Sequence, residues 1–261
     1  MTMGTRKPRT VLVTGGGRGI GRAIALAFGA IGHRVVITGR TEPVLDCVAE
    51  EIRRLGADAF SKTCDITERA QVEELGRTVK ERLGPVEVLI NNAGTAAAAS
   101  FLEMEDSFWE QVLRVNLTGT YNCCKVLLPD MLAARWGRII NIASIVAKVA
   151  YPHVSAYVTA KHAVLGLTRA LAIEIASSGV TVNALCPGYV DTDLTRTNAL
   201  LLAEKTGKSR DEAFAMLKSV SPQKRFIEPE EVARMTVMLA SDSAKGITGQ
   251  AINVDGGTVM S

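Results

Sequence analysis

A glycine-rich turn near the start of the chain constrains the fold more than any other feature. The turn TGGGRGIG follows a short β-branched run, Thr10–Val13, and opens a segment whose apolar residues have helical spacing. Gly15 permits a tight turn, Gly19 lets the backbone approach a pyrophosphate, and Gly21 lets the helix pack closely on the strand. The positive end of the helix would face the phosphates. This order predicts a dinucleotide-binding βα unit, with candidate cofactor residues Thr14, Gly15, Arg18, Gly19, Ile20 and Gly21.

Short β-branched runs alternate with longer amphipathic stretches along the chain. In runs such as 86–90 (VEVLI) and 138–142 (RIINI), apolar residues stand at nearly consecutive positions, as in strands covered on both faces. The pattern predicts an α/β, single-domain Rossmann fold with a seven-stranded parallel sheet between two layers of helices. The predicted strands are Thr10–Val13, Arg34–Thr38, Ala57–Lys62, Val86–Ile90, Arg138–Ile142, Val180–Cys186 and Gln250–Val254.

We expect residues 1–261 to form one domain, because the chain is 47% hydrophobic and contains no linker-like or repeated tract. One long stretch, 189–222, carries no strand pattern. It has apolar patches at 199–203 and 213–217 separated by a polar segment. This composition predicts a substrate-binding lid with an apolar underside.

Composition excludes several classes of function. A net charge of +3, with acidic and basic residues interspersed, gives no basic face for nucleic acid. The five cysteines lack the CxxC spacing of a zinc site, and their odd number argues against a disulfide framework. The polar start of the chain lacks the apolar core of a signal peptide, and no apolar run reaches membrane-spanning length. We therefore expect a cytoplasmic protein without metal, nucleic acid or membrane partners.

The residues after the second predicted strand bear on the choice of dinucleotide. An NAD-type site places Asp or Glu there for the ribose 2′-hydroxyl, whereas this chain has Gly39 and Arg40. A guanidinium binds a 2′-phosphate through two parallel hydrogen bonds, and Arg18 would supply a second cation. The sequence favours NADP(H), with NAD(H) left open if Glu42 takes the ribose role and Arg40 is a solvated surface residue.

A second constellation predicts proton transfer. Tyr157 and Lys161 are four residues apart in a segment with helical spacing, and Ser144 ends a predicted strand upstream. Residues four apart share a helix face, so the ammonium is expected near the phenol, where it would lower a pKa that is normally about 10. Tyr157 would then exchange a proton with a ketone or alcohol oxygen that Ser144 also hydrogen-bonds. A Tyr-x-x-x-Lys pair alone often arises by chance, so its weight comes from the other motifs.

Seven motifs follow one another in a familiar order: TGGGRGIG at 14–21, CDI at 64–66, NNAG at 91–94, Asn116 in VNLTG, Ser144, Tyr157 with Lys161, and PG at 187–188. With them the chain resembles, nearly end to end, the single-domain branch of the short-chain dehydrogenase/reductase family. Within that family it is most similar to 3-oxoacyl-(acyl-carrier-protein) reductases, acetoacetyl-CoA reductases and aromatic polyketide ketoreductases.

The resemblance implies roles that spacing alone does not assign. Asn116, Ser144, Tyr157 and Lys161 would form the family's catalytic tetrad, with Asn116 bending a helix and holding a water that relays protons to Lys161. Lys161 would also bond the nicotinamide ribose, and Tyr157 is implied as a cofactor contact too. A homotetramer is implied, for which 121–132 is a candidate interface helix. Further cofactor contacts are implied for Asp65, Ile66, Asn92, Ala93, Gly94, Pro187, Gly188, Val190 and Thr192.

The expected reaction interconverts a ketone and a secondary alcohol. The apolar patches of 189–222 favour an aliphatic, ring or acyl-chain ketone, and nearby lysines would meet a CoA or carrier-protein thioester or else be solvated. Two alternatives stay open. One is an NAD-dependent 3-hydroxybutyrate-type dehydrogenase, which YVDTDL at 189–194 resembles; the other is a non-catalytic NADP(H)-sensing binder. Neither His153 nor His162 is expected to be catalytic.

Overall fold

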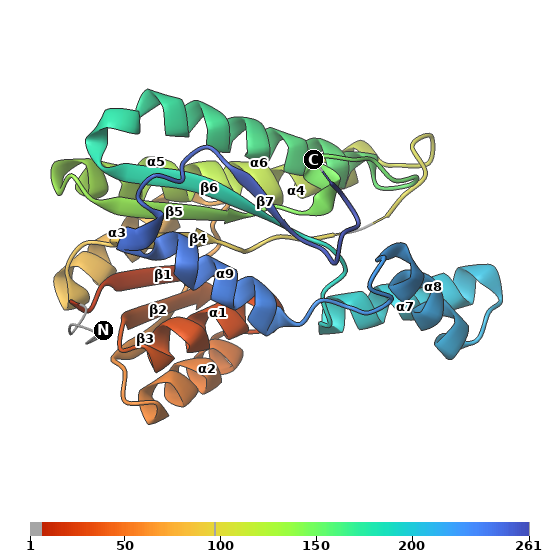
Figure 1. Ribbon diagram of the computed structural model, residues 1–261, viewed down its shortest axis with the longest axis horizontal. Coiled ribbons are helices and arrows are strands. Elements are labelled where there is room, and N and C mark those ends of the chain that lie inside the picture. Colours follow the sequence, from red (N-terminus) through yellow and green to blue (C-terminus); the bar gives the residue numbers. More distant parts are fainter. Residues whose placement is uncertain (1–6, 97, 261) are drawn as a thin grey trace.

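The protein is described here by a computed structural model that covers residues 7–96 and 98–260, with only the backbone at Lys205. In this part of the chain seven strands form one sheet in the order β3-β2-β1-β4-β5-β6-β7, and every neighbouring pair is parallel (Figure 1). The predicted parallel sheet is confirmed, and no predicted strand end differs by more than two residues from the observed one. The strands are β1 (Thr10–Thr14), β2 (Arg34–Gly39), β3 (Ala59–Thr63), β4 (Val88–Asn91), β5 (Gly137–Ile142), β6 (Val180–Pro187) and β7 (Ala251–Val254).

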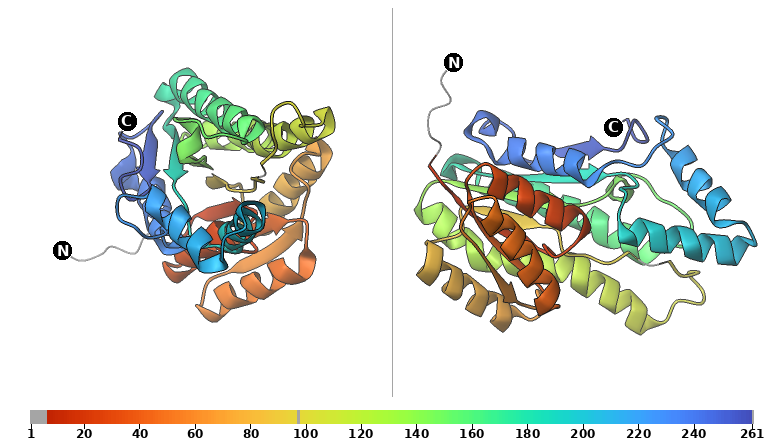
Figure 2. Two further views of the ribbon diagram at one scale, coloured as in Figure 1. Left: turned by 90° about the vertical axis from the view of Figure 1, so that its right-hand side faces the viewer. Right: turned by 90° about the horizontal axis from the view of Figure 1, so that it is seen from below.

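Helices cover both faces of the sheet, because successive residues of a strand point to opposite sides and both sets are apolar here. In β1, Val11 and Val13 pack into a core with α1, α2 and α9, whereas Leu12 packs into a second core with α3 and α5. The end-on view in Figure 2 shows these layers. The helices are α1 (Gly19–Ala30), α2 (Glu42–Arg54), α3 (Arg69–Leu83), α4 (Asp106–Leu113), α5 (Gly119–Ala133), α6 (Ser155–Glu174), α7 (Asp193–Thr206), α8 (Arg210–Val220) and α9 (Pro229–Ala240).

The segment 189–222 leaves the body of the molecule as a pair of helices, α7 and α8, that project beyond the sheet (Figure 1). The Thr192 hydroxyl caps α7 by accepting from the Thr195 N–H, and Ser209 with Glu212 forms a capping box at the start of α8. Val190 bridges to Ile227, and the Asp191 N–H donates to the Ile227 carbonyl. The backbone just before α7 is therefore hydrogen-bonded to the backbone at Ile227, after α8.

Within the described ranges, no helix has the length and apolar character needed to cross a bilayer. The same residues contain no group of three or more His, Cys, Asp or Glu side chains placed to hold a metal ion. All five cysteines are free thiols.

Candidate active site

The residues predicted to be functional gather at the carboxyl ends of the parallel strands. The strand order reverses between β1 and β4, and in open α/β sheets the crevice at such a reversal is where ligands bind. The glycine-rich turn follows β1, the NNAG motif follows β4, and Ser144 follows β5. The fold thus brings together motifs that are far apart in the sequence.

Thr14 fastens the glycine-rich turn to the end of β4. Its hydroxyl oxygen accepts hydrogen bonds from the backbone N–H groups of Asn92 and Ala93, each at 3.0 Å. The Asn92 amide in turn donates to the carbonyls of Thr14 (2.9 Å) and Gly15 (3.1 Å). A Cβ at Gly21 would lie 2.2 Å from the Gly15 carbonyl oxygen, so glycine is required there. The turn and the NNAG loop therefore form one braced unit.

Asn116 lies in a π-helical turn, Arg114–Thr118, between α4 and α5, consistent with the helix distortion that the resemblance implies. The side chain is 1% exposed. Its amide nitrogen donates to the carbonyls of Thr95 and Val112, both at 2.9 Å, and its amide oxygen accepts from the Thr95 N–H at 3.3 Å. Asn116 therefore fixes the loop after β4 against the π-turn.

Tyr157, Ser144 and Lys161 meet as their spacing predicts. The Tyr157 hydroxyl hydrogen-bonds the Ser144 side chain. The Lys161 Nζ lies 5.7 Å from the centre of the Tyr157 ring and donates to the Ile142 carbonyl at 2.8 Å. Lys161 is 5% exposed, so this ammonium lies in the interior beneath the phenol.

The direction of the Tyr157 shift differs from the expected one. The sequence predicts that Lys161 lowers the phenol pKa, but burial raises the pKa of Tyr157 to about 12, opposed by the hydrogen bond from Ser144. Burial also lowers the pKa of Lys161 to about 8. Desolvation is therefore the largest cause of both shifts, and the phenol is protonated at neutral pH.

At the ends of β2 and β3, Arg40 lies near Asp65. Burial alone would raise the pKa of Asp65, but hydrogen bonds from Thr67 and the charges of Arg40 and Arg114 lower it. The Asp65 carboxylate accepts from the Thr67 N–H at 2.9 Å, so it caps the following turn as well as facing Arg40. Arg18 and Arg40 are both exposed.

The other predicted cofactor residues line the same edge. The Gly188 N–H donates to the Val254 carbonyl, which holds the Pro187–Gly188 turn against β7. A Cβ at Gly19 would lie 3.2 Å from the Thr192 methyl group, so Thr192 lies over the glycine-rich turn. Ile66 is buried beside the π-turn, where a Cβ at Gly119 would strike it. His153 and His162 are exposed, and the His162 Nδ1 lies 3.0 Å from the Val158 carbonyl.

Sequence reasoning did not single out two further tyrosines, Tyr151 and Tyr189. Burial raises the pKa of Tyr189, and the neighbouring Tyr151 adds to the shift. Tyr189 directly follows the Pro187–Gly188 motif, and Tyr151 lies between Ser144 and Tyr157 in the chain. The sequence signal that could have identified these two tyrosines is their position after Ser144 and after the Pro187–Gly188 motif.

We predict that Gly94→Ala lowers turnover about tenfold, because a Cβ there would lie 2.7 Å from the Asn116 amide oxygen and 3.6 Å from the Lys161 Nζ. Positioning errors of this kind near reacting groups are costly. Gly166→Ala on α6 is the matched control, since nothing lies within 4 Å of its Cβ and it should gain about 0.5–1 kcal/mol of stability. Steady-state kinetics and thermal melts would check both; equal kinetics in the two variants would contradict the prediction.

The comparisons with known proteins agree with this geometry. A family model described as enoyl-(acyl carrier protein) reductase matches residues 15–259. The chain therefore belongs to the short-chain dehydrogenase/reductase family, a class of oxidoreductase enzymes. It is 39% identical over 257 residues to a putative ketoacyl reductase of Streptomyces coelicolor, covering 98% of each chain.

Two further relatives share nearly their full length with this chain. One is a 3-oxoacyl-(acyl-carrier-protein) reductase of Staphylococcus epidermidis, 39% identical over 253 residues, with 97% of this chain and 99% of the relative covered. The other is a crystal structure of an actinorhodin polyketide ketoreductase variant with NADPH. It superposes with a TM-score of 0.94 at 39% identity, covering 96% of this chain and 97% of that one.

Proposed function

We propose that the protein is an NADP(H)-dependent ketoreductase in which Tyr157 is the general acid and base. The observation that carries the proposal is the hydrogen bond between Tyr157 and Ser144, with the buried Lys161 ammonium beneath the phenol and the glycine-rich turn at the same edge of the sheet. A non-catalytic binder would not need this set, and membership of an enzyme family argues against that alternative.

The residues present fit a phosphorylated dinucleotide. Gly15 and Gly19 have positive φ angles of 64° and 52°, which bend the turn so that the backbone at the start of α1 can approach a pyrophosphate. Arg40 and Arg18 would hold the 2′-phosphate, and Asp65 the adenine side. The related actinorhodin ketoreductase structure contains NADPH, which supports this choice. The nicotinamide ring, when bound, supplies or accepts the hydride.

The proton steps follow from the two pKa shifts. With a pKa of about 12, Tyr157 is protonated at neutral pH and can donate to the oxygen of a bound ketone. The Ser144 hydroxyl donates a hydrogen bond to the same oxygen as negative charge develops there. Lys161, with a pKa of about 8, is mostly protonated at pH 7 and can restore the lost proton along the path that Asn116 completes. At rest the site is therefore prepared for reduction.

For the substrate we propose a 3-oxoacyl thioester or a related apolar or cyclic ketone. Segment 189–222 would act as the lid, since its apolar side chains Leu194, Leu200, Leu201 and Met216 are all at least 41% exposed in the absence of substrate. Relatives named as reductases of 3-oxoacyl carrier proteins and of polyketides support this class. Lys208 and Lys218 on this segment, and Lys224 just after it, would face the anionic carrier.

We also propose a cytoplasmic homotetramer. Five free thiols fit a reducing compartment. The α5 side chain Tyr121 is 43% exposed and the α6 side chain Ile173 is 80% exposed, so these two helices offer apolar surface for pairing. Sedimentation at micromolar concentration would measure the assembly.

A panel of β-keto thioesters, β-keto esters, cyclic ketones and 3-hydroxybutyrate, assayed with NADPH and NADH, tests the proposal directly. We expect oxidation of NADPH with the thioesters or cyclic ketones. The 3-hydroxybutyrate alternative would instead show NAD⁺ reduction by that alcohol and little activity with NADPH. Tight NADPH binding without turnover on any member would contradict the catalytic proposal.

The pH dependence provides a second prediction. Ketone reduction should hold steady near pH 7 and decline as pH rises through about 8, because Lys161 then loses the charge that restores the Tyr157 proton. Alcohol oxidation, which needs proton acceptance, should rise over the same range. A log kcat profile in both directions checks this; a reduction rate that increased between pH 7 and 9 would contradict it.

A further inference from the structure

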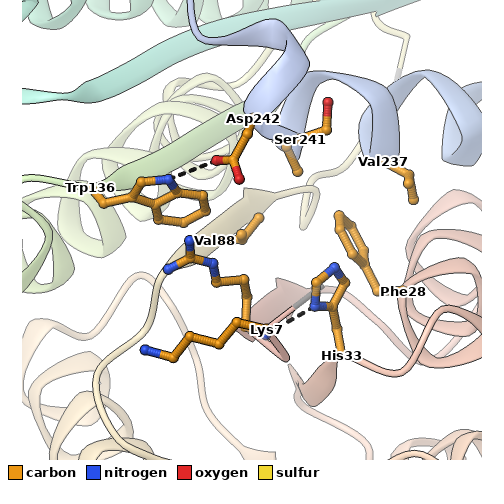
Figure 3. A pocket seen from close by; sticks show the side chains of 10 residues that line it. Lys7, Phe28, His33, Val88, Trp136, Val237, Ser241 and Asp242 are labelled. Atoms are coloured by element: carbon orange, nitrogen blue, oxygen red, sulfur yellow. Dashed lines mark hydrogen bonds between the residues drawn. The ribbon is translucent and has the colours of Figure 1, made fainter. Parts of the chain in front are cut away.

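A cavity lies at the edge of the sheet opposite the catalytic residues. It has a volume of about 350 Å³, within the size range of small-molecule sites. It opens near the amino ends of β1 and β4, between the C-terminal ends of α1 and α9 (Figure 3). None of the predicted cofactor or catalytic residues lines it.

One part of the wall is apolar. Phe28 of α1 and Val88 of β4 are each 1% exposed, and Val237 of α9 is half-buried. Figure 3 shows Phe28 and Val237 on one side of the cavity and Trp136 on the other. The Trp136 indole N–H donates to the Asp242 carboxylate at 3.0 Å, which fixes the ring. Trp136 and Val237 would contact a flat or short apolar body, with the buried Phe28 and Val88 beneath them.

The other part of the wall is cationic. The Arg9 guanidinium, which lines the cavity, lies 3.8 Å from the Trp136 ring centre. Behind the wall, the Arg138 guanidinium lies 4.5 Å from the same ring centre. Lys7 also lines the opening. Arg138 is 2% exposed, and the burial of its charge lowers its pKa even though Asp242 opposes the shift.

The cations around the cavity outnumber the carboxylates. Glu87 accepts from Arg9 at 2.6 Å and lies 3.6 Å from Arg34, so it serves two arginines. Asp242, 3.7 Å from Arg138, is 70% exposed and also accepts from Trp136. In the described structure the Nε–H groups of Arg34 and Arg138 are buried without an acceptor. Four cations, Lys7, Arg9, Arg34 and Arg138, are therefore near two carboxylates, and of these cations Lys7 and Arg9 line the cavity itself.

From this combination we propose that the cavity is a second binding site, which takes a small monocarboxylate with an aromatic or medium-chain apolar body. The carboxylate would pair with Arg9 and Lys7 at the opening, and the body would lie against the accessible surfaces of Trp136 and Val237. Charge and apolar surface are both needed: the cations alone would bind any anion, and the apolar wall alone would bind a neutral compound.

The test is calorimetric titration of 1-naphthoate into the NADPH-saturated enzyme, with 1-naphthalenemethanol as the uncharged analogue and inorganic phosphate as the bare anion. We expect saturable naphthoate binding that is at least tenfold weaker for both analogues. Phosphate binding as tight as naphthoate, equally tight binding of the alcohol, or no saturable naphthoate signal would each overturn the proposal.

Two variants locate the binding. Arg9→Gln should weaken naphthoate at least tenfold by removing the cation, and Val237→Phe should abolish binding by filling the cavity without changing charge. Arg77→Gln, an exposed arginine of α3 that pairs with Glu74, is the matched control and should bind like the parent. Thermal melts and NADPH binding report folding for each variant. Binding that survives in both cavity variants would belong to the substrate cleft and would overturn the assignment.

Discussion

Tyr157→Phe is expected to lower kcat for ketone reduction about 10²- to 10⁴-fold, the usual contribution of general acid–base catalysis. The substitution removes only the hydroxyl that hydrogen-bonds Ser144, and the ring can keep its packing beside Val112 and Ala156. NADPH binding should change little, since the residues proposed for the 2′-phosphate and the pyrophosphate lie elsewhere. Initial rates at saturating ketone, with fluorescence titration of NADPH, measure the two effects separately.

Tyr121→Phe is the matched control, because this 43% exposed phenol of α5 is not among the catalytic residues and the substitution keeps the aromatic ring that the proposed helix pairing would use. It should leave kcat and NADPH affinity unchanged. Turnover of Tyr157→Phe within a few-fold of the parent would contradict the proposed proton donor, whatever the substrate.

Arg40→Asp is expected to reverse the cofactor preference. A hydrogen bond to a charged group contributes about 1.5–3 kcal/mol, so loss of the guanidinium should reduce kcat/KM for NADPH on the order of 10- to 100-fold. The new carboxylate repels a 2′-phosphate and accepts a hydrogen bond from a 2′-hydroxyl, which favours NADH. The ratio of kcat/KM for the two cofactors in parent and variant is the measurement.

Arg54→Asp serves as its control, since this α2 arginine is 74% exposed and pairs only with Glu50 of the same helix in the described structure. It should leave the cofactor ratio unchanged. A parent enzyme that prefers NADH would contradict the role proposed for Arg40 and would favour Glu42 at the ribose.

The sequence was informative about the fold because the periodicity of apolar residues reflects burial directly. The starts of β3 and β4 were placed two residues early. Ala57 and Val86 are 7% and 3% exposed, so they pack in the core, yet they precede the first residues of those strands. Burial sets the apolar pattern, whereas strand pairing sets the strand end, and the two need not coincide.

In the site, helical spacing sufficed to place Tyr157 beside Lys161, because that relation is local. The pKa of Tyr157 could not be predicted in the same way, since burial by residues distant in sequence decides its direction. The cavity beside Trp136 has the same origin: Arg9 and Trp136 are far apart in the chain and meet only because β1 and β5 flank β4.

The bridge between Val190 and Ile227 bears on which helices of this enzyme can be exchanged without disturbing the sheet. Because the start of segment 189–222 is hydrogen-bonded to Ile227, which follows the segment, α7 and α8 form an insertion that the sheet does not depend on for its own hydrogen bonds. In the proposed role of this segment as a lid, exchange or lengthening of these helices would alter which ketones are accepted while β6 and Tyr157 keep their places. Substrate range and chemistry are thus separable in evolution and in protein engineering, with 193–220 as the interchangeable unit.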